Sequence, residues 1–187
     1  MKTLKYLSFL AVIILFSSYQ SEKPDYIYWK DDSELSWEAF KGKPKVYSKG
    51  GAAAFTGIDR YFTYESKSLT IIVIAFFSKS KSWVKEEDKT SSTLAHEQLH
   101  FDISELYARK MRKKYRENRF KKRNFKEDFN KIAEKILVEL NLFQNIYDKE
   151  TTNPRNEEKQ QEWAERVKKE LLELEEYKET NFTVIFK

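Results

Sequence analysis

Two histidines and a glutamate form an HExxH pattern near the middle of the chain, in His96-Glu97-Gln98-Leu99-His100. In an α-helix, residues four apart lie about 40° from one another around the axis, so both imidazole rings can reach one metal ion. Glu97 is turned by about 100° from His96, which puts its carboxylate beside such an ion, where it can accept a proton from water. The spacing therefore predicts a zinc-binding helix with its own general base.

These are the only histidines among the 187 residues of the chain. Random placement would put two histidines four residues apart, with glutamate second, in only about one chain in a thousand. We therefore prefer the metal-binding interpretation to that of a chance pentapeptide on an ordinary core helix.

Catalytic zinc normally takes three protein ligands and keeps one position open, so a third ligand is needed. Asp102 and Glu105 lie about 240° and 180° from His96, and both carboxylates therefore point away from the metal-binding face of the helix. The third ligand must come from elsewhere in the chain. It is neither histidine nor cysteine, because the chain has no further histidine and no cysteine.

The N-terminal residues have the pattern of a secretory signal peptide. Lys2 and Lys5 precede an apolar run at residues 6–16, and small and polar residues follow. The run is too short to span a bilayer as a helix. We predict a signal peptide or N-terminal anchor at residues 1–21, a single zinc-peptidase-like domain at residues 22–187, and export to the periplasm or the cell exterior. Without cysteine, the exported chain has no disulfide bonds.

Basic residues gather between positions 109 and 123, in a chain whose net charge is +5. Such a stretch could bind nucleic acid or an anionic membrane or envelope surface. We favour a solvated helix end and linker, because cations also suit the C-terminus of a helix. An intracellular nucleic-acid binder would require that the N-terminal segment is no signal peptide. We expect no nucleic-acid partner, and we expect a monomer.

Three apolar segments ahead of the motif predict strands, at residues 26–29, 52–58 and 69–77. The third is nearly continuous in its apolar character and rich in β-branched and aromatic residues, which is typical of a buried central strand. The motif helix is expected from about residue 93 to residue 115, with Ser91 or Ser92 as its N-cap.

Two more helices follow. From Phe125 to Tyr147 apolar residues recur at spacings of three and four, which predicts a second helix with one buried face. Residues 148–156 break this pattern, and Asn156 can cap a third helix. With a final strand at residues 181–186, the sequence predicts an α+β fold. A small N-terminal antiparallel or mixed sheet precedes three helices, the first being a zincin-like motif helix, and a C-terminal strand joins the sheet.

The ordered set of motifs resembles a bacterial family of unknown function whose members are described as predicted secreted zinc-dependent proteases. The likeness spans most of the chain after residue 21. It rests on short patterns: Leu35-Ser36-Trp37, Ala52-Ala53-Ala54, Ser82-Trp83-Val84, residues 94–103, Tyr147-Asp148, and Gln160-Gln161 with Trp163. The resemblance implies a zinc protease that acts on a peptide or protein substrate.

The resemblance also implies a third zinc ligand shortly after Tyr147. Relatives look as though they carry histidine and glycine where this chain has Asn153 and Pro154. Asparagine is a poor zinc ligand compared with histidine or a carboxylate. Asn153, Asp148 and Glu150 are the candidates for the third ligand, and the sequence leaves the choice among them open.

These residues predict a mechanism in which Glu97 activates water for attack on a peptide carbonyl. We expect Tyr147 or Tyr107 to donate a hydrogen bond to the oxyanion that forms. The alternative function is that of a catalytically degenerate binding protein of the cell envelope, which keeps the metallopeptidase fold. The departure at Asn153 motivates this alternative.

Overall fold

The computed structural model describes residues 25–44, 47–48, 50–151 and 156–187. The predicted signal peptide or anchor at residues 1–21 lies outside the described residues, and so does Asn153. Among the helices that are described, none is both long enough and apolar enough to cross a membrane.

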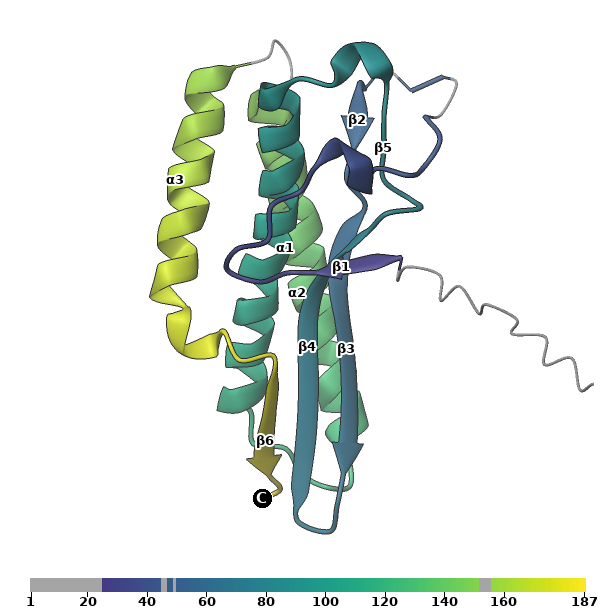
Figure 1. The fold of residues 1–187 in the computed structure, drawn as a ribbon. Coiled ribbons are helices and arrows are strands. Elements are labelled where there is room, and N and C mark those ends of the chain that lie inside the picture. Colours follow the sequence, from purple (N-terminus) through teal and green to yellow (C-terminus); the bar gives the residue numbers. More distant parts are fainter. Residues whose placement is uncertain (1–24, 45–46, 49, 152–155) are drawn as a thin grey trace, which may run out of the picture.

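A four-stranded antiparallel sheet forms one layer of the fold (Figure 1). Its central strand, β4 (Ser68–Ser78), pairs along one edge with β3 (Thr56–Tyr64). The other edge of β4 pairs with β1 (Tyr26–Tyr28) and β6 (Asn181–Ile185). The predicted central position of the segment at residues 69–77 is thus confirmed, and so is the return of the C-terminal strand to the sheet.

The strand predicted at residues 52–58 is two strands. The short strand β2 (Ala52–Ala53) pairs with β5 (Trp83–Val84) in a separate ladder, and β3 begins only at Thr56. The pairing breaks because side chains take up the two intervening backbone N–H groups. Ala54 N–H donates to Glu97, and Phe55 N–H donates to the hydroxyl of Ser82.

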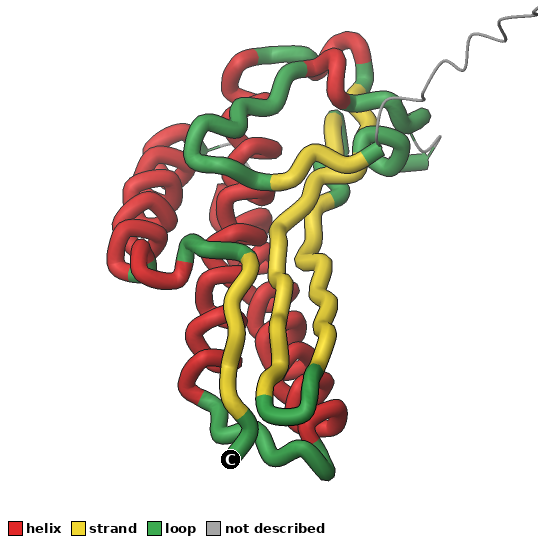
Figure 2. Tube along the Cα trace, turned by 60° about the horizontal axis from the view of Figure 1, so that its bottom comes forward, coloured by secondary structure: helices red, strands yellow, loops and turns green. Residues whose placement is uncertain are grey.

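Three helices lie on one side of the sheet (Figure 1; Figure 2). Helix α1 (Ser91–Glu117) packs against β3 and β4, while α2 (Phe125–Thr151) and α3 (Glu157–Glu173) pack against α1. Asn156 caps α3 as predicted, with its side chain 3.0 Å from the backbone nitrogen of Lys159. The predicted N-cap of α1 was wrong. Thr90 is the cap, because its hydroxyl accepts the backbone N–H of Thr93 at 3.1 Å.

Helix α2 ends one turn later than its apolar pattern predicts, so the expected break at residue 148 was wrong. The hydroxyl of Thr151 donates to the carbonyl of Tyr147 at 2.7 Å, and both side chains are buried. A buried polar residue therefore continues the inward face of the helix where the apolar pattern has ended. Asp148 and Glu150 consequently lie on a helix and not in a loop.

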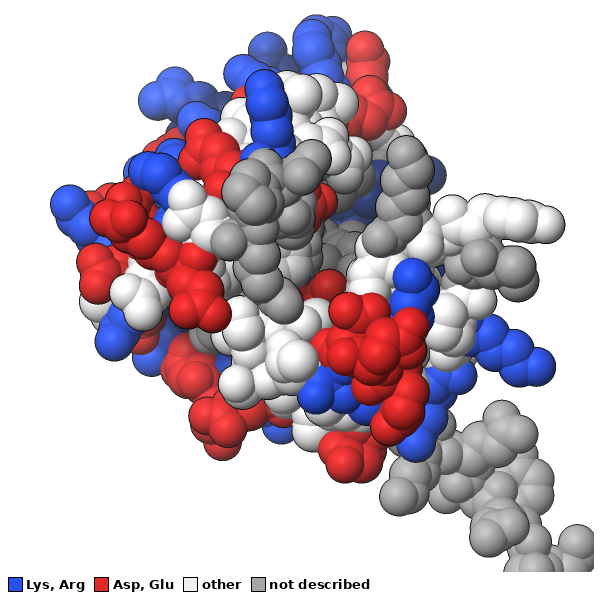
Figure 3. All heavy atoms as spheres, turned by 90° about the horizontal axis from the view of Figure 1, so that it is seen from above, with Lys and Arg blue, Asp and Glu red and all other residues white. Residues whose placement is uncertain are grey.

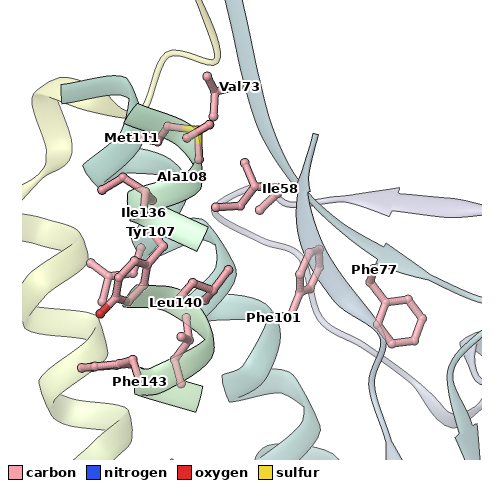
Figure 4. Close-up of a cluster of buried hydrophobic side chains, with 14 of the residues drawn as sticks. Ile58, Val73, Phe77, Phe101, Tyr107, Ala108, Met111, Ile136, Leu140 and Phe143 are labelled. Carbon is pink, nitrogen blue, oxygen red and sulfur yellow. The ribbon is translucent and has the colours of Figure 1, made fainter. Parts of the chain in front are cut away.

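The core fills the space between the sheet and the helices (Figure 4). Alternate residues of β4 point inward and are fully buried, among them Val73 and Phe77. They face an interior that includes Phe101 and Met111 of α1. This packing fixes α1, which carries the HExxH pattern, against the sheet.

Two arginines of the basic stretch at residues 109–123 belong to the interior. Arg109 and Arg112 are 2% and 0% exposed, and both bind the buried carboxylate of Glu105. Arg112 also donates to the carbonyl of Val73 in β4 and to that of Tyr177, which follows α3. These hydrogen bonds hold α1 against β4 and the segment after α3. The two arginines are therefore not available to bind an anionic surface.

Candidate metal centre

Three side-chain donor atoms meet where α1 and α2 face each other. The Nε2 atoms of His96 and His100 are 3.2 Å apart. Oδ1 of Asp148, on α2, lies 3.3 Å from Nε2 of His96 and 2.9 Å from Nε2 of His100. Around a tetrahedral zinc ion with bonds of about 2.0–2.1 Å, ligand atoms are separated by about 3.3 Å. The three atoms therefore have the spacing of a ligand set, and this group could hold a metal ion.

The charges of these groups favour a cation at the same point. Burial lowers the pKa of His100, but its hydrogen bond to Asp148 and the nearby carboxylates outweigh burial and raise that pKa above its ordinary value. Burial raises the pKa of Asp148, yet its contacts with both histidines hold it well below its usual range. A point that attracts a proton between two imidazoles and a carboxylate also attracts a metal cation.

Glu97 lies beside this group without belonging to it. Its Oε2 accepts the backbone N–H of Ala54 at 2.6 Å, whereas Oε1 makes no hydrogen bond with any described residue. Burial raises the pKa of Glu97, and the two histidines and the Ala54 N–H only partly offset this. A carboxyl group with a raised pKa is a better proton acceptor near neutral pH than an ordinary glutamate.

The donor atoms and Glu97 line a cleft of about 1020 Å³. The segment at residues 50–56, which is rich in small side chains, lines it together with Asn141, Gln144 and Asn145 of α2. This end of the molecule is shown in Figure 3, where acidic and basic side chains both surround a central hollow. Among the described residues that line the cleft, the carboxylates are those of Asp88, Glu97 and Asp148, and none is a lysine or arginine.

The structure places neither tyrosine as predicted, because neither lines the cleft. The Tyr147 ring stacks on that of His96, with centroids 4.6 Å apart. Its hydroxyl lies 2.6 Å from Oε1 of Gln160 and 3.2 Å from the carbonyl oxygen of His96. Tyr107 lies almost two turns beyond His100 and packs on Phe143, and burial raises its pKa to about 12. Tyr147 therefore holds His96 in place, and Tyr107 is a core residue.

Of the three candidates for the third ligand, the structure brings Asp148 to the histidines. Glu150 does not reach them, because its Oε2 accepts the indole N–H of Trp163 at 2.9 Å. Asp102 also points away from the metal centre, as predicted, and its Oδ1 accepts a hydrogen bond from Trp29 at 2.9 Å. The sequence offered Asp148 as an acid close to the expected ligand position, but choosing it requires that α2 continue past Tyr147.

Sequence reasoning missed two glutamines. Oε1 of Gln144 contacts Nδ1 of His100, and Oε1 of Gln160 lies 3.2 Å from Nδ1 of His96. The sequence analysis named Gln160 only as part of a motif, and it did not name Gln144. A polar residue between buried positions of a helix has no distinctive sequence pattern.

Fold and site together define an α+β protein with a candidate metal centre between two helices. Residues 79–157 match the family described as a bacterial protein of unknown function (DUF922). This segment includes His96, Glu97, His100 and Asp148. The expected resemblance to a bacterial family of unknown function is thus confirmed over these residues, and the description names no activity. No curated protein and no solved structure matches the chain.

Proposed function

We propose that this protein is an exported zinc-dependent metallopeptidase that hydrolyses peptide bonds. The observation that carries the proposal is the convergence of His96, His100 and Asp148 in a cleft, with one oxygen of Glu97 beside them that makes no hydrogen bond with any described residue. Three protein ligands with a further position left open are typical of catalytic zinc.

The donor set supports zinc more than a hard cation. Two imidazole nitrogens and one carboxylate oxygen suit zinc, whereas calcium and magnesium prefer oxygen ligands alone. Ferrous iron also accepts two histidines and a carboxylate. Glu97 favours hydrolysis over oxygen chemistry, because a general base beside the metal has a direct role in activating water.

The residues divide the reaction between them. When bound, zinc supplies a Lewis acid that polarises a carbonyl and makes water more acidic. Glu97 accepts the proton of the attacking water at Oε1 and delivers it to the leaving amine. The N–H of Ala54 holds Oε2 and so orients the other oxygen. The segment at residues 50–56 lines the cleft, and in this proposal an extended peptide substrate lies along it.

The same geometry weighs against the degenerate binding protein. That alternative was motivated by asparagine at position 153, where a third ligand was expected. Asp148 offers a carboxylate oxygen 3.3 Å and 2.9 Å from the Nε2 atoms of the two histidines, which supports the peptidase over the binding protein. Export rests on the N-terminal sequence alone, and fractionation that finds the protein in the cytoplasm would remove that part of the proposal.

The test is to measure the metal content and peptide cleavage of the purified protein beside two variants, Glu97→Gln and Glu87→Gln. Glu87 is exposed and does not line the cleft, so its variant is the matched control. We expect one zinc per chain in all three proteins. Glu97→Gln should lower kcat by at least about 100-fold, the usual contribution of a general base.

Stoichiometric zinc without cleavage of any peptide in a broad library would instead favour a binding protein. Stoichiometric iron would contradict zinc hydrolysis. Full activity of Glu97→Gln would refute the mechanism.

A further inference from the structure

Each histidine of the candidate metal centre has a glutamine side chain at its second ring nitrogen. Gln144 of α2 contacts Nδ1 of His100, and Gln160 of α3 lies 3.2 Å from Nδ1 of His96. The two glutamines come from different helices and hold different rings. Both Nε2 atoms, by contrast, face Asp148 and each other.

The partner of Nδ1 decides which nitrogen of a neutral imidazole carries the proton. An amide oxygen accepts hydrogen bonds and cannot donate them, so Nδ1 opposite a glutamine Oε1 carries the proton. The hydroxyl of Thr151, 3.4 Å from Nδ1 of His96, also acts as an acceptor there, because it donates its own proton to the carbonyl of Tyr147. The glutamines thus hold Nδ1 of both rings, so that both Nε2 atoms face the metal position, where Nε2 of His100 shares a proton with Asp148 until a metal ion displaces it.

Each glutamine is itself held by other side chains. The Nε2 of Gln144 lies 3.3 Å from the hydroxyl of Ser104 and 3.5 Å from that of Thr56. Both hydroxyls can accept from the amide, which keeps the oxygen of Gln144 turned toward His100. At Gln160, the hydroxyl of Tyr147 donates to the same Oε1 that faces His96.

We propose that Gln144 and Gln160 are the positioning residues of the metal centre. They accept the Nδ1 protons of His100 and His96 and hold both rings in the orientation in which their Nε2 atoms converge on one point. This inference rests on the proposed function for the identity of the bound ion. It also makes α3, nearly all of which lies beyond the matched segment at residues 79–157, part of the site through Gln160.

The chain allows a direct test, since it has only two histidines. Protein labelled with ¹⁵N-histidine gives the signals of just two imidazole rings, whose nitrogen shifts distinguish the two tautomers. The variants are Gln144→Leu and Gln160→Leu, each measured metal-free beside the unchanged protein at one pH. Gln161→Leu is the matched control, because Gln161 is the exposed neighbour of Gln160 on the same helix.

In the unchanged protein we expect Nδ1 of each ring to carry a proton that its glutamine accepts. Gln160→Leu should shift the Nδ1 signal of His96 and leave that of His100 unchanged, and Gln144→Leu should do the reverse. Each variant should weaken zinc binding by about 10–100-fold, the usual effect of losing a partner of a ligand histidine. Gln161→Leu should change neither the ring signals nor the affinity.

The conservative variants Gln144→Glu and Gln160→Glu keep an acceptor at each position. They should retain the Nδ1 proton, which separates loss of the acceptor from general damage to the fold. Ring signals and zinc affinity that stay unchanged in both leucine variants would overturn the proposal. A protein that binds no zinc would remove the proposed function, while the ring signals would still decide the role of the glutamines.

Discussion

Substitution of Glu105 by glutamine should destabilise the protein severely, because it leaves two buried guanidinium groups without their shared carboxylate. Glu105 is 2% exposed, and its oxygens lie 3.0 Å from Nε of Arg109 and 2.8 Å and 3.0 Å from the two terminal nitrogens of Arg112. Removing one partner of a buried ion pair typically costs about 3–5 kcal/mol. For a chain of this size, that loss corresponds to a fall in Tm of roughly 6–20 °C.

The remaining partners of the arginines set the size of this effect. Arg112 keeps the neutral carbonyls of Val73 and Tyr177. Arg109 keeps the carbonyl of Leu171 and also the carboxylates of Glu175, at 2.9 Å, and Asp31, at 3.4 Å. The compensating charge is therefore lost mainly at Arg112, and we expect a loss toward the lower end of this range.

The assay is thermal and urea unfolding followed by circular dichroism. Glu117→Gln is the control, because Glu117 is half-exposed and lies 3.7 Å from an exposed Lys114. An exposed pair of this kind contributes about 0–1 kcal/mol, so the control should unfold almost like the unchanged protein. A loss below about 1 kcal/mol in Glu105→Gln would refute the reasoning, since it would mean that water reaches the guanidinium groups.

Three further predictions concern the cleft. Asp148→Ala should abolish stoichiometric zinc binding, measured by mass spectrometry of the purified protein, and undiminished binding would show that another group supplies the third ligand. Zinc affinity, measured by competition with a chelator, should fall as the pH is lowered through the raised pKa of His100, because protonation removes its lone pair; affinity independent of pH would contradict this. Peptides with lysine or arginine near the cleaved bond should be preferred because the described lining residues include three carboxylates and no lysine or arginine, and Asp88→Lys should weaken the preference whereas Glu87→Lys should not; equal cleavage of acidic and basic peptides would exclude this selectivity.

In the absence of metal, the contact between His100 and Asp148 also makes stability depend on pH. The pKa of His100 is raised in the folded state, so this group contributes stability that is complete below its ordinary pKa and lost as the pH rises through the raised value. The pKa of Asp148 is lowered, so its contribution is present above its ordinary pKa and lost as the pH falls through the lowered value. Bound zinc should oppose the loss on the alkaline side, because it replaces the proton between these groups.

The sequence was most informative where one local pattern decides the outcome. The apolar run at residues 69–77 predicted the central strand, and the spacing of His96 and His100 predicted that both rings reach one point. Angular positions on the helix also predicted correctly that Asp102 and Glu105 point away from it. Each of these features depends on residues within a few turns of one element.

What the sequence did not reveal depends on contacts between elements. Asp148 was assigned to a loop because the apolar pattern of α2 stops at Tyr147, whereas the buried Thr151 continues the helix. The gap between β2 and β3 exists because Glu97, far along the chain, takes the N–H of Ala54. Local propensity carries no information about a partner that only folding brings near.

The metal centre and the buried ion network both depend on the register of α1. His96 and His100 meet Asp148 on one side of the helix, and Arg112, three turns further on, meets the carbonyl of Val73 in β4. A slip of α1 by one residue would move it by about 1.5 Å along its axis and turn it by about 100°. Such a slip would separate the buried charges of the ion network from their partners. Leaving these charges unpaired would cost several kcal/mol of stability. The buried arginines therefore fix the register of α1, and the two glutamines fix the orientation of the imidazole rings. Both exclude arrangements in which the donor atoms would not converge.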